Sequence, residues 1–183
     1  VAWRNPDGSK ALIAYNDASA AKTVTINWGS QHATYSLPGK TSATFTWAGT
    51  QTEGPSQSGA LVGLAGKCLD VAGGSAANGT AVQLYDCNGS TAQRWTVQAD
   101  GSVRALGKCL DVTSGSTADG AKVQLYDCNG SGAQLWSYNA STGDVVNRAA
   151  NKCLDVTGNS SANGSRAQIW SCTGAANQKW RLQ

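Results

Sequence analysis

The sequence predicts an all-β protein, most of which forms a closed body with pseudo-threefold symmetry. The first observation is a repeat: Gly-Lys-Cys-Leu-Asp-Val at residues 66–71 returns at 107–112 and, with asparagine in place of glycine, at 151–156. The second is that Gln-Leu-Tyr-Asp-Cys, in looser form in the third copy, and then Gln-Xaa-Trp follow in the same order each time. A segment that recurs at a nearly fixed period is one structural unit that packs against its neighbours.

A turn-forming pair lies between the first two motifs of every copy, as Asn78-Gly79, Asp119-Gly120 and Asn163-Gly164. Such pairs favour the positive φ angles of a tight hairpin. We therefore expect four short strands in each unit and twelve strands in all. Closing that many strands on themselves removes exposed sheet edges, and the leucines and tryptophans of the motifs are expected to form the core.

Residues 1–49 lie outside the repeat and predict a small antiparallel sheet. Apolar and polar residues alternate along 23–28 and 43–47, which is the pattern of half-buried strands. Asn-Pro-Asp-Gly at residues 5–8 predicts a turn. About five strands in so short a segment leave a face or an edge uncovered, so we expect part of a larger sandwich.

Residues 50–58 have the composition of a linker, and the repeat body is expected over residues 59–183. The chain has no apolar run long enough to span a bilayer, so no membrane partner is expected. Its 14 basic residues are scattered and the net charge is only +3, which argues against a nucleic-acid partner. Any secretion signal would be removed or would lie upstream of Val1.

Six cysteines form three pairs with the same spacing, one pair in each copy of the repeat. The pairs are Cys68 and Cys87, Cys109 and Cys128, and Cys153 and Cys172. Because the spacing is identical, we expect three disulfides within the repeats, each contributing about 3 kcal/mol in the chain-entropy model. Zinc is the rival interpretation, but the pairs are too far apart for an ordinary tetrahedral site, and no metal is expected. Disulfides imply an oxidising compartment, so the protein is expected to be secreted and extracellular.

The N-terminal segment resembles the C-terminal part of the β-sandwich of family 30 glycoside hydrolases. The resemblance rests on Trp-Arg-Asn-Pro-Asp-Gly-Ser at residues 3–9, Ala-Tyr-Asn-Asp at 14–17 and Leu-Pro-Gly at 37–39. Enzymes of that family use two catalytic glutamates on a barrel, whereas this chain has one glutamate, Glu53, in the expected linker. We therefore expect no catalytic residue here, and expect the catalytic barrel to lie upstream. An active hydrolase is the alternative that this reasoning disfavours.

The three repeats resemble the ricin B-type lectins, or family 13 carbohydrate-binding modules, whose fold is a β-trefoil. Cys-Leu-Asp-Val, Gln-Leu-Tyr-Asp-Cys and Gln-Xaa-Trp, in this order and three times over, carry the resemblance across the whole repeat. The resemblance implies a β-trefoil with pseudo-threefold symmetry, preceded by a small antiparallel β-sandwich segment. It also implies that the repeats bind sugar.

The side chains of each repeat suit a sugar ring, which offers an apolar face and a rim of hydroxyl groups. An aromatic ring can stack on the face, a carboxylate can accept from two hydroxyl groups, and an amide both donates and accepts. The candidate residues are Asp70, Gln83, Tyr85, Asn88 and Gln93 in the first copy, Asp111, Gln124, Tyr126, Asn129 and Gln134 in the second, and Asp155, Gln168, Trp170, Asn177 and Gln178 in the third.

The third copy differs from the other two at positions near this set. It has Thr173 where the others have Asn88 and Asn129, and it keeps Asn177 where the others have Ala92 and Ala133. The glutamines of Gln-Xaa-Trp leave two interpretations open, since their amides either contact the sugar or hold the nearby aspartate in place. We expect two similar sites and one distinct site.

We therefore expect a carbohydrate-binding module of a secreted glycoside hydrolase, with polysaccharide or oligosaccharide ligands and no cofactor. The resemblance favours galactose-containing polymers such as galactan or arabinogalactan, with xylan next. A free-standing galactose-binding lectin is the main alternative, and a trefoil protease inhibitor would not need three copies of the aspartate and the aromatic residue. The chain is expected to be a monomer.

Overall fold

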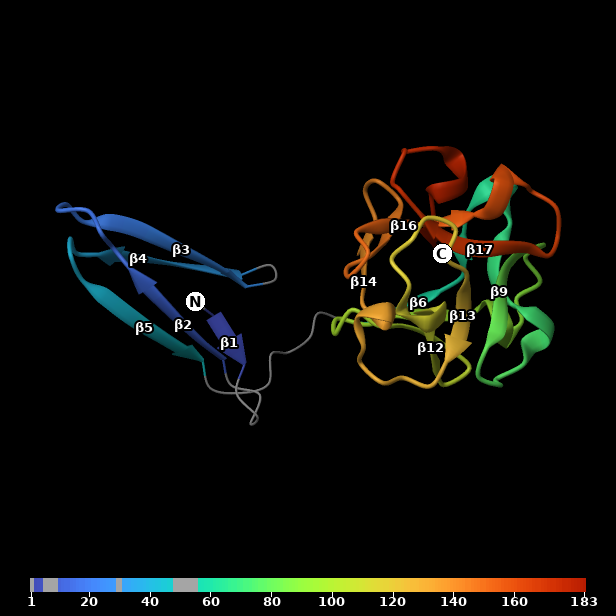
Figure 1. The fold of residues 1–183 in the computed structure, drawn as a ribbon, viewed down its shortest axis with the longest axis horizontal. Helices are drawn as coiled ribbons and strands as arrows, with labels where there is room; N and C mark the ends of the chain where they lie inside the picture. Colours follow the sequence, from blue (N-terminus) through green and yellow to red (C-terminus); the bar gives the residue numbers. More distant parts are fainter. Residues whose placement is uncertain (1, 5–9, 29–30, 48–55) are drawn as a thin grey trace. The chain divides into compact units, whose positions relative to one another are not determined.

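The computed structural model describes residues 2–4, 10–28, 31–47 and 56–183. Packing divides the chain into two compact units, Val1–Gly54 and Pro55–Gln183. The regular elements of the described residues are β-strands and single-turn 3-10 helices (Figure 1), so the all-β prediction is confirmed. The predicted turn at residues 5–8 and Glu53 lie outside the described residues.

The N-terminal unit consists of a three-stranded sheet and a hairpin. Strand β2 (Lys10–Tyr15) pairs antiparallel with β1 (Ala2–Arg4) on one side and with β5 (Ser42–Trp47) on the other. Strands β3 (Lys22–Trp28) and β4 (Gln31–Leu37) form the hairpin. The five strands agree with the number expected from the sequence.

Apolar side chains in the hairpin of this unit are more buried than the polar side chains that alternate with them, as the sequence predicts. Val24 and Ile26 are half-buried, whereas Thr23 and Thr25 are exposed. The loops are held by the buried Asn16, whose side-chain Nδ2 donates to the carbonyl oxygens of residues 20, 37 and 38 at 2.8, 3.0 and 3.1 Å. The asparagine of the Ala-Tyr-Asn-Asp segment thus has a structural role.

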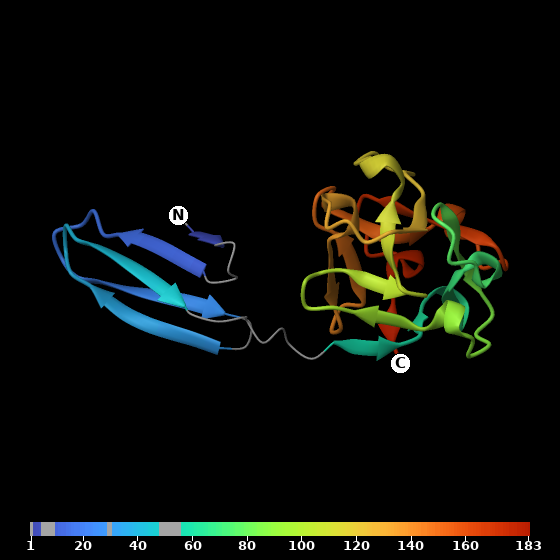
Figure 2. The same cartoon turned by 90° about the horizontal axis from the view of Figure 1, so that it is seen from below.

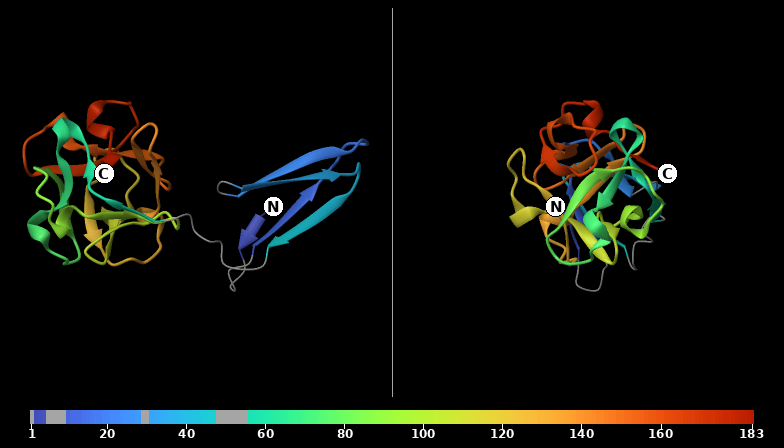
Figure 3. Two further views of the ribbon diagram at one scale, coloured as in Figure 1. Left: turned by 180° about the vertical axis from the view of Figure 1, so that it is seen from behind. Right: turned by 90° about the vertical axis from the view of Figure 1, so that its right-hand side faces the viewer.

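The C-terminal unit contains thirteen strands, twelve of which divide into three lobes of four. Lobe 1 comprises β7 (Leu61–Val62), β8 (Cys68–Val71), β9 (Thr80–Tyr85) and β10 (Trp95–Val97). Lobe 2 comprises β11 (Val103–Ala105), β12 (Lys108–Val112), β13 (Val123–Tyr126) and β14 (Trp136–Asn139). Lobe 3 comprises β15 (Asp144–Asn147), β16 (Lys152–Val156), β17 (Ser165–Trp170) and β18 (Arg181–Leu182). The lobes lie side by side in one body (Figures 1 and 3).

The thirteenth strand changes the expected end of the linker. Strand β6 (Gln57–Gly59) pairs antiparallel with β10, with Gln57 opposite Val97 and Gly59 opposite Trp95 (Figure 2). Gln57 and Ser58 therefore belong to the sheet of the C-terminal unit, although the sequence assigned them to the linker. Composition could not show this, because the strand that pairs with them lies 38 residues away in the sequence.

Repeated motifs form the frame of each lobe. The strand of Cys-Leu-Asp-Val pairs with the strand of Gln-Leu-Tyr in the same register three times, and the glycines of the turn-forming pairs have the expected positive φ angles of 85–87°. The tryptophans of Gln-Xaa-Trp are at most 2% exposed, and their indole N–H groups donate to the carbonyl oxygens of Leu69, Leu110 and Leu154. These bonds satisfy the only polar atom of each ring, so the core buries no unpaired indole.

All six cysteines form disulfides in the predicted pairs, one in each lobe. Each bridge joins the first residue of the Cys-Leu-Asp-Val motif to the segment that follows the strand of Gln-Leu-Tyr. The bridges therefore fix the loop that leads from this strand to Gln-Xaa-Trp, which is the loop that carries Asn88 in lobe 1 and Asn129 in lobe 2.

Candidate functional site

Strand pairing brings the candidate residues of lobe 1 together. Asp70 on β8 lies directly opposite Gln83 on β9, so that both side chains point to the same face of the hairpin. Gln83 Nε2 donates to Asp70 Oδ1 at 2.9 Å, and Gln93 Nε2 donates to Asp70 Oδ2 at 3.0 Å. The carboxylate is only 5% exposed and is held by one amide on each oxygen. Each oxygen retains a lone pair that can accept a further hydrogen bond.

The pocket at this carboxylate measures about 390 Å³, which is within the range of small-molecule sites. It is lined by Asp70, Gln83, Tyr85 and Asn88, together with small residues of two loops. Tyr85 is 39% exposed, which is unusual for a large aromatic side chain in this core-forming strand. The structure thus places four predicted residues around one opening.

Lobe 2 repeats this arrangement. Asp111 Oδ1 accepts from Gln124 at 2.8 Å and Asp111 Oδ2 accepts from Gln134 at 3.0 Å. The pocket measures about 630 Å³, is lined by Asp111, Gln124, Tyr126 and Asn129, and includes Thr113 from the loop after β12. Tyr126 is 38% exposed. Lobes 1 and 2 therefore present the same set of groups to solvent.

Lobe 3 places its residues in the same positions but connects them differently. Asp155 accepts three hydrogen bonds, from Gln168 at 2.8 Å, from Gln178 at 3.1 Å and from Asn177 at 2.7 Å. The additional donor is the asparagine that lobes 1 and 2 replace by alanine. Trp170 is 42% exposed and supplies the aromatic face. The sequence prediction of two similar sites and one distinct site agrees with this geometry.

Asn88, Asn129 and Thr173 each hold their loop through a hydrogen bond to its backbone. The side-chain oxygens of Asn88 and Asn129 accept from the backbone N–H two residues on, which leaves their Nδ2 atoms as donors. Thr173 Oγ1 likewise accepts from the backbone N–H of Ala175, and its hydroxyl group also donates to Gln178 Oε1. The loop of lobe 3 thus lacks the amide that the other two loops provide.

The glutamines of Gln-Xaa-Trp lie behind the aspartates. Gln93, Gln134 and Gln178 are 1–2% exposed. Each donates to the aspartate and to a backbone carbonyl oxygen, and each accepts from the backbone N–H of residue 88, 129 or 173. Because both ends of these amides are used inside the protein, we assign them the positioning of the carboxylate, which is one of the two roles that the sequence left open.

Each pocket borders the turn of a neighbouring lobe, a relation that the sequence did not show. A methyl-sized atom on Gly79 would lie 3.9 Å from Gln124 Oε1, and one on Gly164 would lie 4.0 Å from Gln83 Oε1. One on Gly120 would lie 3.6 Å from Cζ3 of Trp170 and 3.9 Å from Gln168 Oε1. The three sites are therefore built at the seams between lobes.

An ion pair and an amide close the seams next to the pockets of lobes 1 and 2. In each, the lysine of Gly-Lys-Cys pairs with the aspartate of Tyr-Asp-Cys, and an asparagine from the turn of the adjacent lobe bonds to both. The groups are Lys67, Asp86 and Asn163 at one seam, and Lys108, Asp127 and Asn78 at the other. The Asn163 amide and then the Lys67 ammonium hold the pKa of Asp86 below 3.8, and Lys108 and then Asn78 do the same for the pKa of Asp127.

The third seam also has an ion pair, but its carboxylate belongs to the turn of the neighbouring lobe. Ser171 replaces the aspartate of Tyr-Asp-Cys, and Asp119 replaces the asparagine of the turn. Lys152 donates to Asp119 at 2.6 Å, and the Ser171 backbone N–H also donates to it, at 2.7 Å. The hydrogen bond from Lys152 is the main cause of the lowered pKa of Asp119. The two substitutions therefore compensate each other across the seam.

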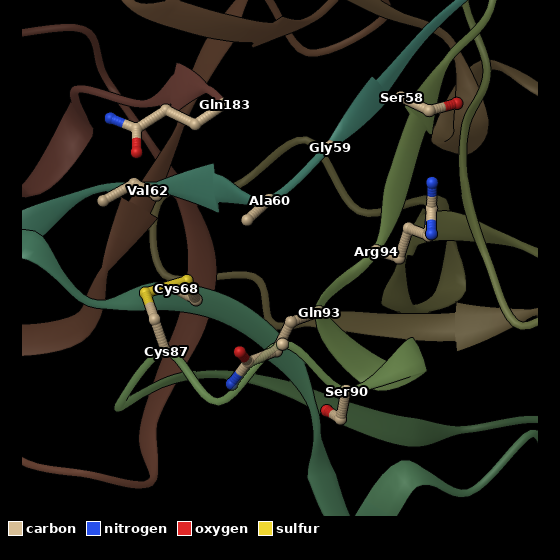
Figure 4. Close-up of a pocket in the computed structure, with 11 residues that line it drawn as sticks. Ser58, Gly59, Ala60, Val62, Cys68, Cys87, Ser90, Gln93, Arg94 and Gln183 are labelled. Carbon is tan, nitrogen blue, oxygen red and sulfur yellow. A yellow bond between two sulfur atoms is a disulfide. The ribbon is translucent and has the colours of Figure 1, made fainter.

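A further pocket, of about 420 Å³, is lined by Gln93 but by no other candidate site residue. Figure 4 shows Ser58 and Arg94 on one side of it and the Cys68–Cys87 disulfide on the other. Its lining residues include no aromatic ring and no carboxylate, so it does not offer the groups that a sugar ring requires.

Within the described residues, no group of three or more His, Cys, Asp and Glu side chains is arranged to hold a metal ion. The same part of the chain has no helix that is both long enough and apolar enough to cross a bilayer.

Comparison with protein families matches both units of the chain. Residues 57–180 match the ricin-type beta-trefoil lectin domain, and residues 1–45 match the glycosyl hydrolase family 30 beta sandwich domain. A glucan endo-1,3-beta-glucosidase of Cellulosimicrobium cellulans is 38% identical over 108 residues, which are 55% of this chain and 20% of that protein. The matched part of the chain spans about a fifth of the length of the curated relatives that it resembles.

Solved structures show the same fold. The designed threefold-symmetric protein ThreeFoil is 36% identical, with a TM-score of 0.64 over 68% of this chain and 96% of that one. A non-toxic homologue of type II ribosome-inactivating proteins from Momordica charantia, in complex with α-methyl-D-galactoside, is 27% identical, with a TM-score of 0.60 over 69% of this chain and 47% of that one. The β-trefoil prediction for the repeats is confirmed.

Proposed function

The chain belongs to the ricin-type β-trefoil lectin family, and we propose that it is the non-catalytic, carbohydrate-binding part of a secreted glycoside hydrolase. Its trefoil would hold the enzyme on a polysaccharide. The match of residues 1–45 to the family 30 sandwich supports the link to a glycoside hydrolase, as does the likeness to a glucanase. The three disulfides are consistent with an extracellular location.

One observation carries this proposal: the pockets of lobes 1 and 2 contain the same four predicted residues in the same arrangement. The aspartate is fixed before any ligand arrives, so its free lone pairs are aimed without further ordering of the side chain. The half-exposed tyrosine offers a flat apolar face beside it. A sugar ring that stacks on the tyrosine can direct two hydroxyl groups to the carboxylate.

The distribution of sites suits a polymer better than a single sugar. Open pockets of this size hold one or two sugar units and bind them weakly. When several such sites lie on one body, binding at one site raises the effective concentration of the chain's remaining sites around the same polymer. We therefore propose that the physiological ligand is a polysaccharide with repeated units, bound by a monomeric module.

A galactose-containing polysaccharide, such as galactan or arabinogalactan, is our first choice. The Momordica charantia relative is in complex with a galactoside, which supports galactose as the sugar. The likeness to glucan endo-1,3-beta-glucosidases supports a β-1,3-glucan as a second candidate. Xylan and a free-standing galactose-binding lectin remain alternatives that the same experiment separates.

The test is retardation of the purified chain in gels that contain galactan, β-1,3-glucan or xylan. Variants Tyr85→Ala, Tyr126→Ala and Trp170→Ala are compared singly and together. We expect each substitution to weaken its own lobe about tenfold, from the loss of stacking and of buried ring area, and the triple variant to migrate freely. Tyr15→Ala is the matched control, because Tyr15 is an exposed tyrosine of the other unit. Retardation of the triple variant equal to that of the parent would show that the pockets are wrongly assigned.

A further inference from the structure

A lysine side chain from lobe 2 lies beside the candidate site of lobe 3. Lys122, which precedes β13, lies opposite Gln168 in an isolated β-bridge between the two lobes. Its Nζ donates to Gln168 Oε1 at 2.7 Å and to Thr157 Oγ1 at 2.9 Å. Gln168 and Thr157 are the counterparts of Gln124 and Thr113, which line the pocket of lobe 2. The ammonium group therefore lies between two residues of the corresponding site in lobe 3.

The same amide connects the ammonium to the aromatic face. Gln168 Oε1, which accepts from Lys122, lies 3.9 Å from the position of a methyl-sized atom on Gly120, and Cζ3 of Trp170 lies 3.6 Å from that position. The cation, the ring and the Asp155 carboxylate, to which Gln168 also donates, thus border one site.

This ammonium keeps a donor for a ligand. Within the described part of the chain Lys122 makes two hydrogen bonds and no ion pair, while an ammonium group has three N–H donors. The carboxylate of Asp119, which belongs to the same turn as Gly120, is paired with Lys152 at 2.6 Å. Asp155 accepts from three amides, which spread over both of its oxygens. One N–H of Lys122 is therefore available to an acceptor from outside the protein.

Lobes 1 and 2 have no ammonium group at this position. The residue opposite Gln124 in lobe 2 is Ala81. The residue opposite Gln83 in lobe 1 is Arg166, but its Nη2 donates to a backbone carbonyl oxygen of β13 at 3.2 Å. Lobe 1 also has Ala72 at the position of Thr157. The lining of the pockets of lobes 1 and 2 includes no basic side chain, whereas the site of lobe 3 has an ammonium group beside its carboxylate.

On the premise that the trefoil binds sugar, we propose that lobe 3 binds an acidic sugar unit, a uronic acid, whereas lobes 1 and 2 bind neutral units. The sugar ring stacks on Trp170 and its carboxylate accepts a charge-assisted hydrogen bond from Lys122. In lobes 1 and 2 the same carboxylate would face Asp70 or Asp111 with no basic side chain in the pocket lining to offset the repulsion. The module would then recognise neutral polysaccharide chains that carry uronic acid substituents.

The test compares two probes that differ only at C6, methyl galacturonide and methyl galactoside, by calorimetric titration of the full chain. We expect one galacturonide site per chain, which weakens about tenfold in Lys122→Met, as for the loss of a hydrogen bond to a charged group. Galactoside binding by lobes 1 and 2 should be unchanged in that variant. Added salt should weaken galacturonide binding more than galactoside binding.

Ala81→Lys in lobe 2 provides the gain-of-function control, because Thr113 and Gln124 are already in place there. This variant should bind a second galacturonide. Since the gain does not depend on the stability of Lys122→Met, it tests the inference even if that variant unfolds. Galactoside binding without any galacturonide binding, or Lys122→Met with unchanged galacturonide affinity, would overturn this inference alone. Binding of neither probe would overturn the proposed function as well.

Discussion

Replacing Gln93 by alanine tests the claim that the glutamine of Gln-Xaa-Trp positions the aspartate. Its side chain is 2% exposed and makes hydrogen bonds to Asp70 Oδ2 at 3.0 Å, to the Asp86 carbonyl oxygen at 2.9 Å and from the Asn88 N–H at 2.8 Å. The bond to the carboxylate is worth about 2 kcal/mol and the other two about 1 kcal/mol each. Gln93→Ala should therefore lower the free energy of unfolding by about 4 kcal/mol.

Gln83→Ala is the matched control, because it removes one hydrogen bond to the same carboxylate from the solvent-facing side. It should cost only about 2 kcal/mol. The assay is urea unfolding followed by the indole N–H signals of Trp95, Trp136 and Trp180, which are buried in the trefoil and so report on that unit. If Gln93→Ala costs no more than Gln83→Ala, the positioning role is refuted.

Two further predictions concern the stability of the trefoil. The lowered pKa values of Asp86, Asp119 and Asp127 mean that their ion pairs stabilise the fold above the unfolded-state pKa of 3.8, and that this contribution is lost as the pH falls through the folded-state values. The urea midpoints of the parent and of Asp127→Asn should therefore differ at neutral pH and converge as the pH falls through the lowered pKa of Asp127, and a difference that persists in acid would contradict this assignment. Replacing both Cys109 and Cys128 by serine should lower the free energy of unfolding by about 3 kcal/mol, since the bridge closes a short loop; an unchanged urea midpoint would contradict the estimate.

Features that recur within one lobe were predictable from the sequence. The spacing of the cysteines predicted the three disulfides, and the order of the motifs predicted which strands pair. Asp70 and Gln83 belong to two strands that the turn-forming pair at residues 78–79 predicted to form a hairpin. These contacts join residues that are close in the sequence. The same motifs occur in all three repeats, which strengthens the prediction.

Contacts between lobes were not predictable in this way. Lys122 and Gln168 are 46 residues apart, and Asp119 and Ser171 are 52 apart. The contact of Asp119 is made at the other two seams by Asn163 and Asn78, so the repeat does not show which charged groups meet. The sequence also did not decide whether the glutamine of Gln-Xaa-Trp contacts the sugar or the aspartate, because the residue type is the same in both cases.

The amino-acid sequence by itself determined the repeated frame: three hairpins, three disulfides, three core tryptophans and the residue types of three sites. Only the tertiary structure decided how the sites differ, since each one is completed by a turn or a side chain from a neighbouring lobe. The physical reason is that a local pattern fixes backbone register, whereas the charge of a pocket depends on every side chain that packing brings to it.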